Sequence, residues 1–153
     1  MAGMYYEDFV IGKVLAHEAT RTVTEADNLL ITALTMNVQP LHLDAEFAGQ
    51  SMYGQRIVNS IFTLGLVTGI PVQETTLGTT LANLGFREIE FPKPVFIGDT
   101  LRVETEALDK RVSNSRPDTG IVGIEHRGYN QRDELVCVVR RTALMKRQPG
   151  AGP

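Results

Sequence analysis

The stretch Ile57-Val-Asn-Ser-Ile-Phe-Thr-Leu-Gly-Leu-Val-Thr-Gly-Ile70 is strongly apolar and contains no charged residue. Its apolar side chains would fall on nearly every side of a helix, and such a helix has to be covered by other elements. The run is shorter than the roughly 20 apolar residues that span a bilayer, and asparagine, serine and threonine interrupt it. We therefore predict a buried helix over 57–69, which Pro71 ends.

Four runs of strand type follow this helix and supply its cover. They span residues 81–91, 100–108, 120–130 and 134–145. In the second run Leu101, Val103, Thr105 and Ala107 alternate with charged residues, so the sheet has one buried and one wet face. This order of elements predicts an α+β fold, with an antiparallel sheet wrapped around a long central apolar helix.

A second helix is predicted before the apolar stretch. Thr24-Glu-Ala-Asp27 fits a capping box, in which the threonine hydroxyl and the carboxylate three residues later satisfy free N–H groups of the first turn. The helix would run from Glu25 to about Met36. Its inner face would consist of the apolar residues at helical spacing, which are Leu29, Leu30, Ala33 and Leu34.

The 153-residue chain has the composition of one ordinary domain, with 42% hydrophobic and 22% charged residues. A formal net charge of -3 argues against a general binder of nucleic acid or anionic membranes. Cys137 is the only cysteine and is expected in the core, and the acidic N-terminus does not resemble a secretory signal. We predict one domain over 1–147, a disordered tail over 148–153 and a cytoplasmic location.

The segment around His42 is the candidate chemical site. His42 lies between two leucines, shortly after the helix-breaking Pro40, in a turn that ends where Asp44 caps a short helix over 45–50. A neutral imidazole in such an apolar turn can act as a general base, and a structural core histidine is the alternative. His17 and His126 are expected to be surface or sheet residues.

Several motifs follow one another in a characteristic order. They are Tyr6-Glu-Asp-Phe9 with Gly12, Val23-Thr-Glu-Ala-Asp27, Asn37-Val-Gln-Pro-Leu-His42 with Ala48, Tyr53-Gly-Gln-Arg-Ile-Val58 and Pro94-Val-Phe-Ile-Gly-Asp-Thr100. Together they resemble the MaoC-like hydratases, a family that includes (R)-specific enoyl-CoA hydratases and has the hotdog fold. The resemblance implies a homodimer or higher oligomer, acyl-CoA bound at the subunit interface, and no metal or redox cofactor.

The resemblance also implies roles for individual residues. In the family's hydratases an aspartate and a histidine five positions later hold the reacting water, and these positions correspond to Asn37 and His42. An amide cannot accept a proton from water, so Asn37 either orients the water or caps the loop. A backbone N–H at the start of the buried helix, here that of Ser60, would form the oxyanion hole. Gly54 and Thr68 are further candidates for substrate binding.

Other polar residues have two interpretations each. Asn59 either braces the His42 turn or contacts the thioester. Ser60 and Thr63 would ordinarily bond back to the preceding helical turn. Arg111 and Arg116, in the connection from Lys110 onward, suit the phosphates of coenzyme A, and a solvated loop is the alternative.

The predicted function is that of a hydratase or dehydratase acting on an enoyl-CoA thioester. The residues at 37, 39, 59 and 60 resemble a branch associated with mesaconyl-CoA or itaconyl-CoA, and such a substrate requires an arginine in the pocket for its second carboxylate. A hotdog thioesterase is one alternative, because a fold does not fix chemistry. A non-catalytic acyl-CoA-binding protein is the other, because Asn37 replaces the family's aspartate.

Overall fold

The protein is described by a computed structural model that places residues 3–150. Its strands are β1 (Val14–Ala16), β2 (Arg21–Thr22), β3 (Thr80–Glu90), β4 (Thr100–Val112), β5 (Thr119–Tyr129) and β6 (Leu135–Lys146). Its helices are the 3₁₀ turn η1 (Tyr6–Asp8), α1 (Glu25–Leu34), α2 (Pro40–Leu43), α3 (Ala45–Gly49), α4 (Ser60–Gly69) and α5 (Val72–Thr75). The sheet has the order β1-β4-β5-β6-β3, β2 pairs with β4, and all pairs are antiparallel.

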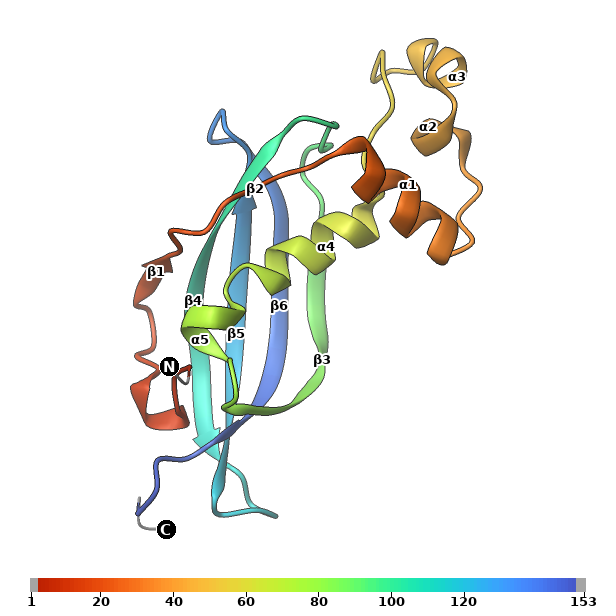
Figure 1. The fold of residues 1–153 in the computed structure, drawn as a ribbon. Helices are drawn as coiled ribbons and strands as arrows, with labels where there is room; N and C mark the ends of the chain where they lie inside the picture. Colours follow the sequence, from red (N-terminus) through yellow and green to blue (C-terminus); the bar gives the residue numbers. More distant parts are fainter. Residues whose placement is uncertain (1–2, 151–153) are drawn as a thin grey trace.

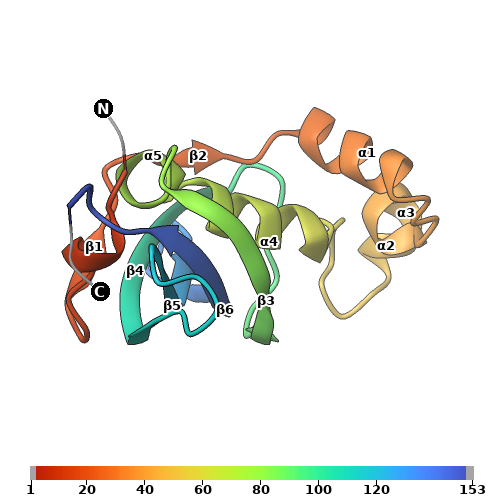
Figure 2. The same cartoon turned by 90° about the horizontal axis from the view of Figure 1, so that it is seen from below.

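The sheet curves around α4, which lies against one face of it (Figures 1 and 2). Val67 on α4 packs into a cluster with Leu101 and Val103 of β4 and Val139 of β6, and all four side chains are almost fully buried. Helices α1, α2 and α3 project beyond the β3 side of the sheet, at the N-terminal end of α4 (Figure 1). This end of the molecule contains the candidate site.

The main sequence predictions of the sheet are confirmed. The four long strands lie where the strand-type runs indicated, and the alternating residues of β4 are buried on the α4 face. The capping box at α1 is present, with the Thr24 hydroxyl accepting from the Asp27 N–H at 3.2 Å. Cys137 is buried in the core, and burial raises the pKa of its thiol to about 12.

The central helix differs from its prediction in two ways. It begins at Ser60 rather than Ile57, because Asn59 caps it and Ile57 forms an antiparallel bridge with Phe96. It is also covered on one side only: Thr63 and Val67 are buried, whereas Ile61 is 51% exposed. One sheet can cover only one face of a helix, so the rest of the apolar surface needs another partner. No helix within residues 3–150 has the length and hydropathy that a membrane span requires.

The predicted inner face of α1 is wrong. Leu29, Leu30 and Leu34 are exposed, and the buried residues of the helix are Asn28 and Thr32. The reason is that α1 does not pack on the sheet. It contacts α2 and the N-terminal end of α4, and it does so through this polar pair one helical turn apart.

The two ends of the domain lie together. The Gln148 amide N–H donates to Glu7 at 2.9 Å, and the Gln148 side chain donates to Asp8 at 2.9 Å. Residues 151–153 of the predicted disordered tail lie outside the described residues.

A chain of buried hydrogen bonds runs beneath α5. Arg141 Nε donates to His126 Nε2 at 2.9 Å, so in the neutral ring Nδ1 carries the proton and donates to the Thr105 hydroxyl at 2.8 Å. Thr105 in turn donates to His17 Nε2 at 2.8 Å, and His17 Nδ1 donates to Glu74 at 3.0 Å. His126 is therefore a residue of the sheet, as expected, but both histidines are buried and neither is a surface residue.

The directions of these bonds fix the charge of His126. Burial, followed by the nearby Arg141 and His17, lowers the pKa of His126 well below its ordinary value of 6.5. In the unfolded chain this histidine titrates near 6.5. Below that pH the unfolded state binds a proton that the folded state does not bind, so the free energy of unfolding decreases as the pH falls.

We predict that lowering the pH from 7.5 to 5.5 reduces the free energy of unfolding, because the unfolded chain then binds a proton at His126 that the folded chain excludes. Urea titrations at the two pH values measure this change. His126→Gln is the matched variant, because glutamine can donate to Thr105 and accept from Arg141 without titrating. A wild-type pH dependence that His126→Gln leaves intact would show that His126 is not its source.

Candidate active site

His42 lies on α2, a single helical turn that starts at Pro40 rather than the irregular turn that the sequence predicts. The side chain is 8% exposed. Its Nδ1 lies 2.9 Å from the carbonyl oxygen of Ile57, and a carbonyl can only accept, so Nδ1 carries the proton. The lone pair is therefore on Nε2. A neutral histidine held in this tautomer is suited to accept a proton at Nε2.

Asn28 on α1 fixes this histidine segment to the start of α4. Its Nδ2 donates to the His42 carbonyl oxygen at 3.0 Å, and its Oδ1 accepts from the Asn59 N–H at 2.9 Å. Asn59 in turn donates to the Thr32 hydroxyl at 3.3 Å and accepts from the Ile61 N–H at 3.0 Å. Of the two interpretations of Asn59, this geometry corresponds to the brace.

Ser60 is the first residue of α4, so its N–H lies among the free donors of the first helical turn and at the positive end of the helix dipole. It borders a pocket of about 130 Å³ that is also lined by Tyr53, Ile57, Thr63 and Lys93. Ile57 links His42 to this pocket, because its carbonyl oxygen accepts a hydrogen bond from His42 and Ile57 itself lines the pocket. The sequence predicted that the Thr63 hydroxyl bonds to a carbonyl of the preceding helical turn. In the structure the Thr68 hydroxyl makes such a bond, to the Leu64 carbonyl oxygen at 2.9 Å.

Asn37 makes the hydrogen bond of a loop-capping residue. Its Oδ1 accepts from the Gln39 N–H at 3.1 Å, which leaves Nδ2 as the free part of the amide. Asp44, the nearest carboxylate in sequence to His42, caps α3 through a bond from the Phe47 N–H at 3.0 Å. Both side chains therefore have structural tasks within the turn.

The remaining predicted residues are placed elsewhere. Gly54 has φ of 69° and lines a separate hollow of about 350 Å³ with Glu25 and Arg56, which form an ion pair. Arg111 lies at the end of β4 and Arg116 in the connection from β4 to β5, at the end of the molecule opposite α1, α2 and α3 (Figure 1). One chain therefore does not bring these arginines to the Ser60 pocket, and their binding of coenzyme A stays a prediction.

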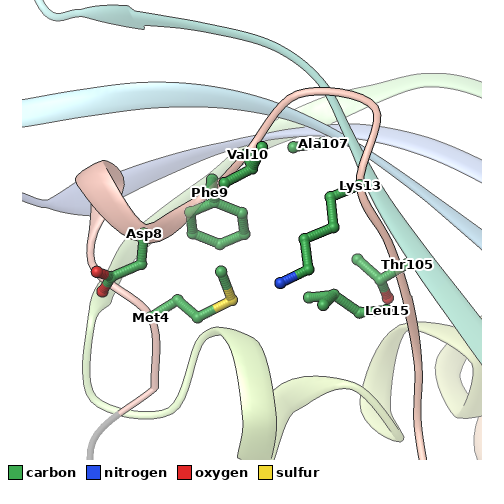
Figure 3. Close-up of a pocket in the computed structure, with 8 residues that line it drawn as sticks. All are labelled: Met4, Asp8, Phe9, Val10, Lys13, Leu15, Thr105 and Ala107. Carbon is green, nitrogen blue, oxygen red and sulfur yellow. The ribbon is translucent and has the colours of Figure 1, made fainter.

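A second cavity, of about 30 Å³, lies between the N-terminal arm and β4. Figure 3 shows the Lys13 ammonium pointing into it, with Met4 and Phe9 on its walls. A water molecule needs roughly 10–15 Å³ of such space, so this cavity is large enough for about two waters but not for an acyl group.

Sequence reasoning missed several of these residues. Asn28 and Thr32 were hidden because the leucines beside them suggested an apolar inner face, and only their four-residue spacing could have identified them. Tyr53 and Lys93 reach the pocket through tertiary structure alone. Within residues 3–150, no group of three His, Cys, Asp or Glu side chains is arranged to hold a metal ion, and the predicted absence of a metal stays a prediction.

Known relatives share this chain's sequence over nearly its whole length. The mesaconyl-CoA hydratase of Cereibacter sphaeroides is 34% identical over 152 residues, which is 99% of this chain and 44% of the relative. The beta-methylmalyl-CoA dehydratase of Chloroflexus aurantiacus is 32% identical over 97% of this chain and 42% of the relative. The chain thus spans less than half the length of these curated relatives.

Solved structures share the fold. A monoamine oxidase regulatory protein from Archaeoglobus fulgidus superposes with a TM-score of 0.86 at 31% identity, over 97% of this chain and 98% of that one. A Mycobacterium tuberculosis protein described as a double hotdog superposes with a TM-score of 0.87 at 24% identity, over 99% of this chain and 46% of that one. The predicted hotdog fold is confirmed. The model of the MaoC like domain matches residues 8–137, and the chain belongs to this family.

Proposed function

We propose that the chain is a hydro-lyase that adds water reversibly to the double bond of an enoyl-CoA thioester. One arrangement carries the proposal: the Ile57 carbonyl holds His42 with a proton on Nδ1, which in the neutral ring leaves Nε2 free to accept, and Ile57 lines one pocket together with Ser60. A base and an oxyanion donor around one pocket are what hydration of an α,β-unsaturated thioester requires. The hydratases and dehydratases among the relatives support this class of reaction.

The proposed reaction uses these groups in sequence. His42 Nε2 takes a proton from water while the water oxygen bonds to the β-carbon, and the electrons of the double bond move to the thioester oxygen. The Ser60 N–H stabilises this enolate. The α-carbon then takes up the proton from His42, which restores the neutral imidazole. The reverse sequence eliminates water.

Asn37 would position the water rather than activate it. Its Oδ1 is engaged by the loop, whereas Nδ2 remains available to donate to the water oxygen. A water that accepts from Asn37 and donates to His42 Nε2 keeps a second lone pair for the β-carbon. The acid-base work then falls to His42 alone.

A short, branched acyl group is the proposed substrate, of the mesaconyl or itaconyl type. The pocket of about 130 Å³ is close in size to a cavity of roughly 150 Å³ that holds a benzene ring, so it suits a short acyl group rather than a long chain. The named activities of the relatives agree with a dicarboxylyl thioester. The arginine expected for the second carboxylate is not among the residues that line this pocket.

We also propose a homodimer or higher oligomer. Within the described residues β3 pairs with β6 on one side only, and Leu81, Leu84 and Phe86 on this edge strand are exposed. Leu30 and Leu34 on α1 are exposed as well. A second copy would cover these surfaces, and the Mycobacterium tuberculosis protein described as a double hotdog has two such units in one chain.

An assay that follows both the enoyl absorbance and free thiol distinguishes the possible reaction classes. The purified protein should remove the enoyl absorbance of mesaconyl-CoA or itaconyl-CoA without releasing free thiol. Thiol release measured in the same cuvette with a disulfide reagent would identify a thioesterase instead. Tight acyl-CoA binding with neither change would identify a non-catalytic binding protein.

His42→Ala should lower kcat by about 10² to 10⁴-fold, which is the usual contribution of general acid-base catalysis. His42→Asn is the matched variant, because its amide can still donate to the Ile57 carbonyl while it lacks a basic nitrogen. Both variants should lose activity to a similar extent, with His42→Asn retaining the wild-type thermal stability. A near-normal rate in His42→Asn would exclude His42 as the base.

Asn37→Asp should fold like the wild type, because a carboxylate also accepts from the Gln39 N–H. It places a second proton acceptor beside the water, so we expect kcat to rise. Steady-state rates over a range of pH test this. A folded variant with unchanged kcat would mean that residue 37 does not contact the reacting water.

A further inference from the structure

Lys93 is the only charged residue among those lining the Ser60 pocket. It follows β3 in the segment Phe91-Pro-Lys-Pro94, where a proline on each side restricts the backbone. The other residues around the pocket are apolar or carry a hydroxyl group. A single cation in such a setting favours a ligand with one anionic group at matching distance from the reacting carbons.

The ammonium group of Lys93 is bound in a way that permits exchange. Its Nζ lies 2.7 Å from Glu134 Oε1, and its side chain is 54% exposed. Glu134 has two further donors on its other oxygen, Asn130 at 2.8 Å and Arg132 at 2.9 Å. An exposed ion pair of this kind contributes little to the stability of the fold, so Lys93 can leave Glu134 for another carboxylate at a low cost in free energy.

Glu134 remains satisfied without Lys93. Hydrogen bonds from Asn130, Lys93 and Arg132 lower the pKa of Glu134 to about 2, and two of these three donors do not depend on the lysine. Its carboxylate thus stays ionised and paired after the exchange.

Tyr53 adds a second donor to the same pocket. Its backbone N–H bonds to Ser51, whereas its hydroxyl makes no hydrogen bond to any residue within 3–150. A phenol that is half-buried in a substrate pocket usually has a partner there. A carboxylate between Lys93 and Tyr53 would supply it.

Four arginines that could have paired with a substrate carboxylate are engaged elsewhere. Arg21 pairs with Asp27, Arg87 with Asp109 and Arg140 with Glu125. Arg141 points to the buried His126. None of the four lines the Ser60 pocket.

We propose that Lys93, assisted by the Tyr53 hydroxyl, binds a carboxylate at the far end of the acyl group and so selects dicarboxylyl over monocarboxylyl thioesters. This inference rests on the proposed function, because it assigns the specificity of the same pocket. It identifies a lysine where the sequence led us to expect an arginine.

The test compares two saturated coenzyme A esters that differ in the carboxylate. Succinyl-CoA and butyryl-CoA both have four-carbon acyl groups, and neither can be hydrated, so calorimetric binding needs no turnover. Lys93→Met should weaken succinyl-CoA binding by about 10- to 100-fold, the range of a charge-assisted hydrogen bond, and leave butyryl-CoA binding unchanged. Lys93→Arg should retain the preference for succinyl-CoA. Tyr53→Phe should weaken the binding of succinyl-CoA several-fold and leave that of butyryl-CoA unchanged.

Arg132→Gln is the matched control, because it removes another cation from Glu134 without touching the pocket. It should bind both esters as the wild type does. Equal affinity of the wild type for the two esters would overturn the inference, as would a Lys93→Met variant that weakens both to the same extent. These outcomes are separate from failure of the proposed function, in which the wild type hydrates no enoyl-CoA whatever its binding preference.

Discussion

Asn28 is a fully buried amide on which the geometry of the candidate site depends. It is the only side chain in the described part of the chain that bonds to the backbone of both the His42 segment and the start of α4. Each of these backbone groups would otherwise be a buried, unpaired polar atom, which costs free energy. The amide thereby sets the positions of His42 and of the start of α4 relative to each other.

The long strands and the buried face of β4 could be predicted from the sequence, because in a strand alternate residues point to opposite faces and the buried ones are apolar. In β4 the contrast between Leu101 or Val103 and the intervening charges has one explanation, and the structure agrees with it. The capping residues Thr24 and Asp44 were predictable because their hydrogen bonds are local in the sequence. A cap is a local hydrogen bond between residues three positions apart, so nothing distant can alter it.

The parts that could not be predicted depend on contacts between distant residues. The leucines of α1 form the apolar stripe of an ordinary surface helix, yet Asn28 and Thr32 face inward because the helix packs on α2 and the start of α4 rather than on the sheet. Lys93 is as polar and as exposed as a solvated lysine, and only the path of the chain after β3 places it at the pocket. His17 and His126 are 109 residues apart and meet only through Thr105.

The incomplete cover of α4 is a requirement of the proposed chemistry rather than a defect of the fold. An N–H at the start of a helix can stabilise an enolate only if substrate can reach it, and Ser60 is exposed at the first turn of α4, whereas the buried residues Thr63 and Val67 lie further along the helix. Ile61, on a different side of α4 from Val67, is also exposed to solvent in a single chain. In the proposed dimer, a second hotdog unit would cover this apolar surface while leaving a channel to Ser60.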